Sequence, residues 1–112
     1  MNVLLPLAVV AIAGTATIAS AENTLSSARL QPTTSSVTFD LVTSEGIGVV
    51  EIYDYHGQAV GKLLGSQAVA LGGNPGLRVQ MNPPPFHDVI AVLTVDGVKM
   101  VDQVVEFHRH GR

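Results

Sequence analysis

Two histidines near the end of the chain have the spacing of a metal-binding pair. His108 and His110 flank Arg109, and two imidazoles close together can coordinate copper, nickel or zinc. The sequence fixes no aspartate, cysteine or methionine beside them to complete a set of ligands. Chain ends are usually solvated, so we interpret His108 and His110 as weak metal candidates on a tail and predict no cofactor.

Two further pairings of histidine with aspartate suggest acid–base chemistry. His87 precedes Asp88 directly, and Asp54 lies two residues before His56, so each histidine could act as a base with a carboxylate to orient it. A hydrolase would also need a nucleophile on a strained turn. The serines lie in the polar segment before Val37 or singly in turns, and we therefore predict no enzymatic activity.

Tyr53 and Tyr55 lie two positions apart, so they share one face if this segment is a strand. If they are exposed, they form a contact patch. Tyrosine also fits a half-buried strand well, and sheet packing is the interpretation that we favour.

Charge and composition exclude several classes of function. The chain of 112 residues has 6 basic and 9 acidic residues and a net charge of −3. Its basic residues do not cluster as they do in proteins that bind phosphate backbones. We therefore predict no nucleic-acid partner and no basic surface for membranes. The absence of cysteine removes disulfides, thiol chemistry and cysteine zinc sites.

The first 21 residues have the pattern of a secretory signal peptide. Val3 to Ala13 is an almost unbroken apolar run, and Ala19-Ser20-Ala21 is a small-residue cleavage site. We expect cleavage after Ala21, export to the periplasm and no stable membrane association afterwards. A retained transmembrane anchor is the alternative, but a span needs about 20 apolar residues and Gly14 already interrupts this one.

The mature chain has a three-part organisation. We predict a loose lead-in over residues 22–36, with an edge strand at Leu25 to Leu30, a folded domain over 37–107 and a flexible tail over 108–112. Alternation at Val37, Phe39 and Leu41 indicates a half-buried strand, and in the strand expected next Val50 and Ile52 would share the buried face. The further strands are expected at residues 47–54, 58–64, 67–71, 77–81, 88–95 and 98–107, with a loop over the five helix and strand breakers at 72–76.

The strongest local signal is Asp96-Gly97 between two apolar runs, which predicts a two-residue type I′ hairpin. That turn would place Val95 opposite Val98, Leu93 opposite Met100, and Val92 opposite Val101. The run from Val89 to Val95 is apolar on both faces, as in a central strand. About seven strands, no helix and regular turn signals predict an all-β protein, an immunoglobulin-like antiparallel β-sandwich. A small barrel is the alternative architecture.

The segment from Leu77 to Gln103 resembles the carboxy-terminal half of the small periplasmic curli-assembly chaperones, which inhibit amyloid formation. The similarity lies in Leu77 to Pro83, in Asp88 to Gly97 and in Gln103. It covers about a quarter of the chain. The Cys-x-Cys pair of enteric members is missing here, so the resemblance is to a branch without it.

The resemblance implies a non-enzymatic, monomeric periplasmic protein that binds the unfolded amyloid subunit transiently and delays its polymerisation. Such a chaperone can act through a polar sheet surface or by pairing with an edge. From strand alternation, our candidates for partner binding are exposed polar positions of one sheet: Arg78, Gln80, Lys99 and Gln103.

Two other functions remain open. Val50 to Gly57 and Val95 to Lys99 also look like the immunoglobulin-like sorting modules found at the ends of secreted proteins, which suggests an accessory domain of a secretion or surface system. A periplasmic metal-handling protein is the third alternative. It depends on the histidine tail and on Met81 and Met100.

Overall fold

The computed structural model describes residues 23–31 and 34–107, which form strands joined by turns and loops. The strands are β1 (Thr24–Ser26), β2 (Arg29–Gln31), β3 (Ser36–Ser44), β4 (Gly48–His56), β5 (Ala59–Val69), β6 (Gly72–Gln80), β7 (Val89–Val95) and β8 (Val98–Val105). No helix that could span a membrane occurs in this part of the chain. The predicted all-β class is confirmed.

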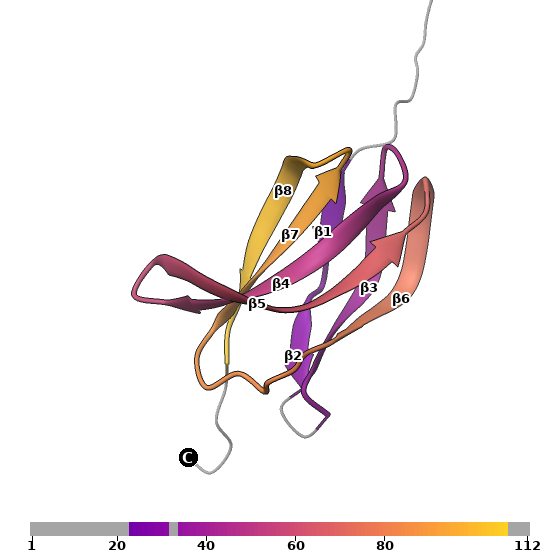
Figure 1. The fold of residues 1–112 in the computed structure, drawn as a ribbon. Coiled ribbons are helices and arrows are strands. Elements are labelled where there is room, and N and C mark those ends of the chain that lie inside the picture. The colour runs from indigo at the N-terminus through magenta and orange to yellow at the C-terminus, as the bar shows by residue number, and fades with distance from the viewer. Residues whose placement is uncertain (1–22, 32–33, 108–112) are drawn as a thin grey trace, which may run out of the picture.

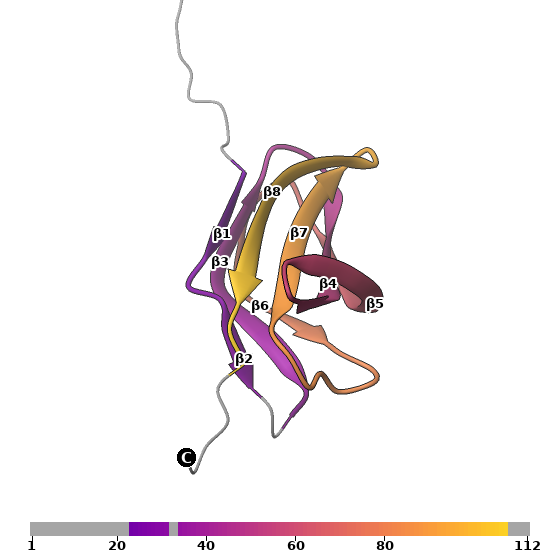
Figure 2. The ribbon, with the colours of Figure 1, turned by 90° about the vertical axis from the view of Figure 1, so that its left-hand side faces the viewer.

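The strands form two antiparallel sheets that pack as a β-sandwich. In the first sheet, β3 pairs with β1 and β2 along one edge and with β6 along the other, while the second sheet has the order β5-β4-β7-β8. Figure 2 shows β1, β2 and β3 in one layer and β7 and β8 in the other. The hairpin of β4 and β5 projects beyond the body of the sandwich (Figure 1).

Side-chain alternation explains the core. Val50 and Ile52 on β4, which we expected on one buried face, are fully buried, and Val37, Phe39 and Leu93 join them from β3 and β7. β7 lies in the middle of its sheet, as its doubly apolar sequence predicts. The contact between the two inner faces therefore excludes water without any disulfide.

The polar segment before residue 37 contains two short strands instead of the single edge strand expected there. β1 and β2 lie end to end along β3, with Leu25 opposite Val42 and Leu30 opposite Val37. Between them Ser27 has a left-handed φ of 56°. This break changes which side chains face the core on both strands, so Val42 is buried and Leu41, predicted on the buried side, is 39% exposed.

The loop predicted over Gly72–Gly76 is wrong, because these residues begin strand β6 and pair with β3. β6 pairs with β3 on one side only, and proline is tolerated on such an edge strand. The side-chain amide of Asn74 ties the start of β6 both to the turn after β5 and to β3. Its Oδ1 accepts from the Ala70 N–H at 2.9 Å, and its Nδ2 donates to the Val42 carbonyl at 3.2 Å.

The two weak strands predicted around Gly65-Ser66 are one long strand, β5. At Gly65 this strand passes so close to the end of β6 that a Cβ atom would collide with the Gln80 carbonyl. The Asn82 N–H donates to the Leu64 carbonyl at 2.7 Å beside this crossing. Glycine is therefore required here by close backbone approach and does not mark a turn.

The Asp96-Gly97 turn forms as predicted, with positive φ at both residues and Val95 opposite Val98. The register beyond it is wrong by one residue, because a bulge places Leu93 opposite Val101 and Val92 opposite Asp102. The extra residue is Met100, whose side chain packs against the core. Its burial explains why the strand accepts the bulge.

Candidate functional site

The four predicted binding residues do not share one sheet. Arg78 and Gln80 lie on β6 of the first sheet, whereas Lys99 and Gln103 lie on β8 of the second. All four are on edge strands. The outer face of each sheet therefore has to be considered separately.

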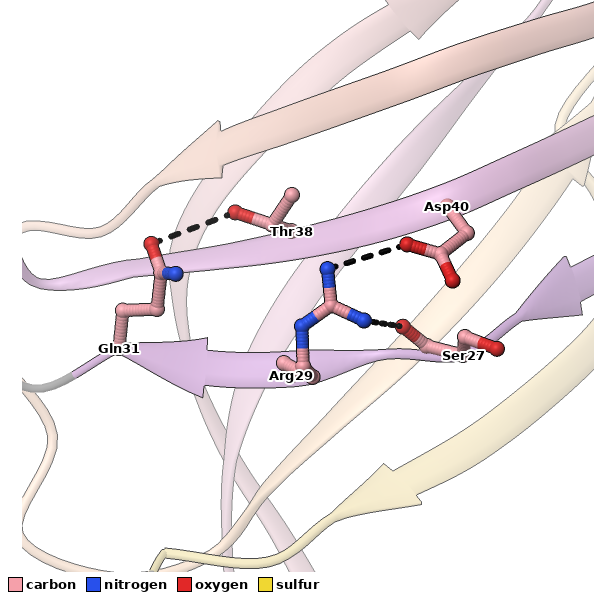
Figure 3. Close-up of polar contacts among 5 residues, drawn as sticks. All are labelled: Ser27, Arg29, Gln31, Thr38 and Asp40. Atoms are coloured by element: carbon pink, nitrogen blue, oxygen red, sulfur yellow. Dashed lines mark hydrogen bonds and ion pairs between the residues drawn. The ribbon is translucent and has the colours of Figure 1, made fainter.

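Polar side chains of β2 and β3 contact one another on the outer face of the first sheet (Figure 3). Arg29 on β2 contacts Asp40 on β3 through Nη2 and Oδ1 at 3.0 Å. The hydrogen bond and the positive charge of Arg29 lower the pKa of the Asp40 carboxyl from its usual value. Thr38 donates to the Gln31 Oε1 at 3.5 Å, so these two strands satisfy each other's polar groups.

Arg78 and Gln80 extend this polar face across β6. Arg78 lies opposite Thr38, and its exposed guanidinium forms no ion pair with the residues that the structure describes. The side-chain amide of Gln80 is used within the protein, because its Nε2 donates to the Thr34 carbonyl at 2.6 Å. Gln80 therefore has a structural role at the chain turn before β3.

The candidates on β8 are not equivalent either. Lys99 is exposed and forms an ion pair with Asp102 at 2.7 Å. Gln103 is half-buried because the bulge at Met100 places it opposite Ala91, on the side of the strand that faces the core. Only Lys99 of this pair lies on an outer face.

The outer face of the second sheet has a row of apolar side chains that crosses all four strands. The pairings place Leu63 on β5 opposite Tyr53 on β4, Tyr53 opposite Ile90 on β7, and Ile90 opposite Val104 on β8. Leu63 is 48% exposed and Val104 is 40% exposed at the two ends, whereas Tyr53 is half-buried and Ile90 is 8% exposed between them. We call these four residues, Leu63, Tyr53, Ile90 and Val104, the apolar row.

Alternation along β4 fixes the direction of the apolar row. Val50 and Ile52 point into the core, so Glu51 and Tyr53 point outward. The Tyr53 hydroxyl donates to the Glu51 Oε1 at 3.0 Å. This hydrogen bond, together with partial burial, raises the pKa of Tyr53 above its usual value and orients the ring along the sheet surface.

Carboxylates flank the apolar row on both sides. The neighbouring cross-strand rows contain Glu51 and Asp102 on one side and Asp88 and Glu106 on the other, by continuation of the same pairings. Lys99 lies one row further and is paired with Asp102. The second sheet therefore has an apolar row within an acidic surface, a pattern that fits an apolar partner with basic residues.

An open pocket of about 430 Å³ lies next to the apolar row, at the turn of the β4–β5 hairpin. Its walls include the Gly57-Gln58 turn and Asp88, whose Oδ1 accepts from the Phe107 N–H at 2.9 Å. Rings form most of the lining: Tyr55, His56, Phe86, His87 and Phe107. Phe86 is 74% exposed, which makes it the most accessible of the apolar rings.

The histidine and aspartate pairs singled out in the sequence meet at this pocket, although in a different combination. The rings of His56 and His87 lie 4.1 Å apart between centroids. His87 Nδ1 lies 3.6 Å from Asp54 Oδ1, which is buried and has no hydrogen-bond donor among the described residues. Asp88 instead holds the backbone of Phe107, so Asp54 is the carboxylate beside His87.

No group of three metal-ligating side chains with suitable geometry occurs in residues 23–31 and 34–107. Met81 is buried and Met100 packs against the core, so neither sulfur is presented to a metal at the surface. His108 and His110 lie outside the described residues, as does the segment predicted to be a signal peptide.

Sequence reasoning missed the apolar row because its members come from four strands whose registers were unknown. One signal was present. Val89 to Val95 is apolar on both faces, and its outward positions include Ile90 and Val92. That pattern also fits an exposed apolar face.

Comparisons with known proteins found no significant match to any family model, to any curated protein or to any solved structure. The function is therefore inferred from the geometry of the outer faces and from the residues themselves.

Proposed function

We propose that this protein is an exported, non-enzymatic chaperone that delays amyloid polymerisation by binding an unfolded amyloid subunit transiently on the outer face of its second sheet. The observation that supports this proposal best is the apolar row, which crosses a whole four-stranded sheet and has exposed members at both ends, Leu63 and Val104. The resemblance of Leu77 to Gln103 to the curli-assembly chaperones suggests the same class of client.

The physical mechanism is competition for apolar side chains. Amyloid nuclei form when extended segments stack and bury identical side chains against each other. A client segment lying on the apolar row would bury its apolar groups against Leu63, Tyr53 and Val104 instead. Burial of apolar area contributes about 25 cal/mol per Å², so contact with one row gives the weak, reversible binding that a transient chaperone needs.

The acidic flanks restrict which clients bind. Glu51 and Asp102 on one side of the row, with Asp88 and Glu106 on the other, repel acidic segments and attract basic ones. The same charges oppose stacking of this face on a second copy of the protein. We therefore expect the protein to be a monomer. Charged residues on its edge strands also discourage the addition of strands from other molecules.

The proposal places the mature protein in the periplasm, where it meets the subunit before secretion. This location rests on the signal-peptide pattern that ends at Ala21. Binding to the row needs no cofactor or energy source, because burial of apolar surface is itself favourable.

The deciding experiment is a thioflavin assay of curli-subunit polymerisation with substoichiometric amounts of the mature protein. We expect a longer lag phase in proportion to the protein added, with little effect on the elongation of preformed fibrils. Serum albumin at the same mass concentration is the control for nonspecific adsorption. An unchanged lag at every ratio would refute the proposed function.

A further inference from the structure

We propose that the ring-lined pocket at the turn of the β4–β5 hairpin binds an arginine side chain of an extended client segment. This inference deepens the proposed function and rests on it for the identity of the partner. Tyr55 belongs to the cross-strand row next to the apolar row, opposite Val60. A client lying on the apolar row would therefore pass the mouth of the pocket.

The lining favours a flat cation. Tyr55, Phe86 and Phe107 present aromatic rings, and the ring quadrupole attracts cations placed over its face. Phe86 follows the proline run Pro83 to Pro85, with which it lines a second, smaller hollow, and each proline fixes the backbone φ of this loop. An exposed ring on a stiff loop loses little conformational entropy when a ligand stacks on it.

The charges around the pocket have the sign that a cation needs. Asp88 lines the pocket, and its carboxylate retains acceptor capacity after accepting the Phe107 N–H. Asp54 does not line this pocket but the smaller hollow beside it, which Lys62 also lines, so Asp88 is the carboxylate that a ligand in the pocket would meet. No lysine or arginine contributes to the pocket wall in the described part of the chain.

The shape distinguishes arginine from other side chains. A guanidinium is planar and can stack on a ring while its N–H groups reach a carboxylate, whereas an ammonium is a compact, strongly hydrated charge. An uncharged aromatic side chain would match the rings, but it would partly desolvate the Asp88 carboxylate without offering a donor to its remaining acceptor sites. The pocket therefore fits an arginine better than a lysine or a phenylalanine.

The test is an NMR titration of the ¹⁵N-labelled mature protein with N-acetyl-arginine methylamide. The neutral citrulline analogue, which has nearly the same shape, is the matched ligand control, and the phenylalanine analogue tests the aromatic alternative. We expect saturable shifts at the amides of Tyr55 to Gln58, His87 and Asp88, with affinity in the millimolar range. Citrulline should bind at least tenfold more weakly.

Variants locate the binding. Phe86→Ala and Asp88→Asn should each weaken arginine binding at least fivefold, and the amide oxygen that Asp88→Asn introduces can still accept the Phe107 N–H. Ile47→Ala, which removes another exposed apolar side chain, and Asp40→Asn, which removes a carboxylate from the first sheet, should change nothing. Equal affinity for citrulline, tighter binding of phenylalanine, or no shifts at the pocket would overturn the inference. If the lag extension persists in that case, the proposed function stands without the arginine contact.

Discussion

The outer faces of the two antiparallel sheets differ in polarity. On the first sheet, Arg29, Thr38 and Arg78 lie in one cross-strand row. On the second sheet, a cross-strand row consists of the apolar residues Leu63, Tyr53, Ile90 and Val104. Antiparallel sheets ordinarily have one apolar face toward the core and one polar face toward water.

This difference separates a polar face from the face that we propose binds a partner. The first sheet follows the ordinary pattern, and its polar groups largely bond to each other. The second sheet departs from it most fully along the apolar row, which has carboxylates on either side. Exposed apolar side chains on a sheet surface can mark an interaction site, and here they are Leu63 and Val104 at the two ends of the row.

The two outer faces stay separate only if the two sheets remain packed back to back. Gly65→Ala should disturb this packing most. The new methyl group would collide with the Gln80 carbonyl where β5 passes β6. We expect a loss of about 1–3 kcal/mol in the free energy of unfolding, measured by urea denaturation. Gly73→Ala is the matched control because its methyl group meets only the Leu41 side chain at ordinary contact distance. Equal stability of the two variants would mean that the strands do not cross as described.

Charges placed on the apolar row should sharpen the contrast between the faces. We expect the double variant Leu63→Asp, Val104→Asp to need at least tenfold more protein for the same lag extension in the thioflavin assay, because aspartate cannot bury a client's apolar groups. The control is the double variant Leu41→Asp, Leu71→Asp, which places the same two charges at exposed positions outside the apolar row. An equal loss in both variants, with the fold intact by circular dichroism, would point to net charge and not to the row.

The ion pair on the first sheet should affect stability in a pH-dependent way and leave chaperone activity unchanged. Arg29 lowers the pKa of Asp40 in the folded state, so its stabilisation is present above the unfolded pKa of about 3.9 and is lost as the pH falls through the folded value. Asp40→Asn should therefore lower the melting temperature slightly at pH 7 but not at pH 2. A constant difference across this range would exclude the pair as the cause.

The smallest predicted effect concerns the hydroxyl of Tyr53. The hydrogen bond to Glu51 raises its pKa above about 10, so this contribution to stability is present below that pH and is lost as the pH rises. Glu51→Gln should lower the pKa of Tyr53, seen as earlier phenolate absorbance in a near-ultraviolet titration. Tyr53→Phe identifies which part of the titration belongs to Tyr53. An unchanged curve in Glu51→Gln would show that the hydroxyl has another partner.

Local signals in the sequence predicted the elements that depend on neighbouring residues. Alternation placed Val50 and Ile52 in the core, and Asp96-Gly97 formed its turn, because both effects involve residues a few positions apart. Prediction was wrong at Gly72–Gly76, where an edge position accepts residues that a central strand would exclude. It was also wrong at Met100, where packing against the core favours a bulge.

The candidate site was harder to predict because it depends on contacts between distant strands. Nothing in the spacing of Leu63, Tyr53 and Val104 indicates that they lie in one row, since two bulges on β5 and one on β8 set the registers. The predicted residues Arg78 and Gln103 were separated onto different sheets for the same reason. The pairing of His87 with Asp54 likewise follows from where the loop before β7 meets β4.

The central claim, that one outer face binds the client and the other does not, is tested most directly by NMR mapping. The ¹⁵N-labelled protein would be titrated with freshly unfolded, unlabelled amyloid subunit. The account predicts that shifts and line broadening concentrate at Tyr53, Leu63 and Val104, with Arg29, Thr38 and Arg78 unaffected. Changes confined to the first sheet, or spread equally over both faces, would contradict it.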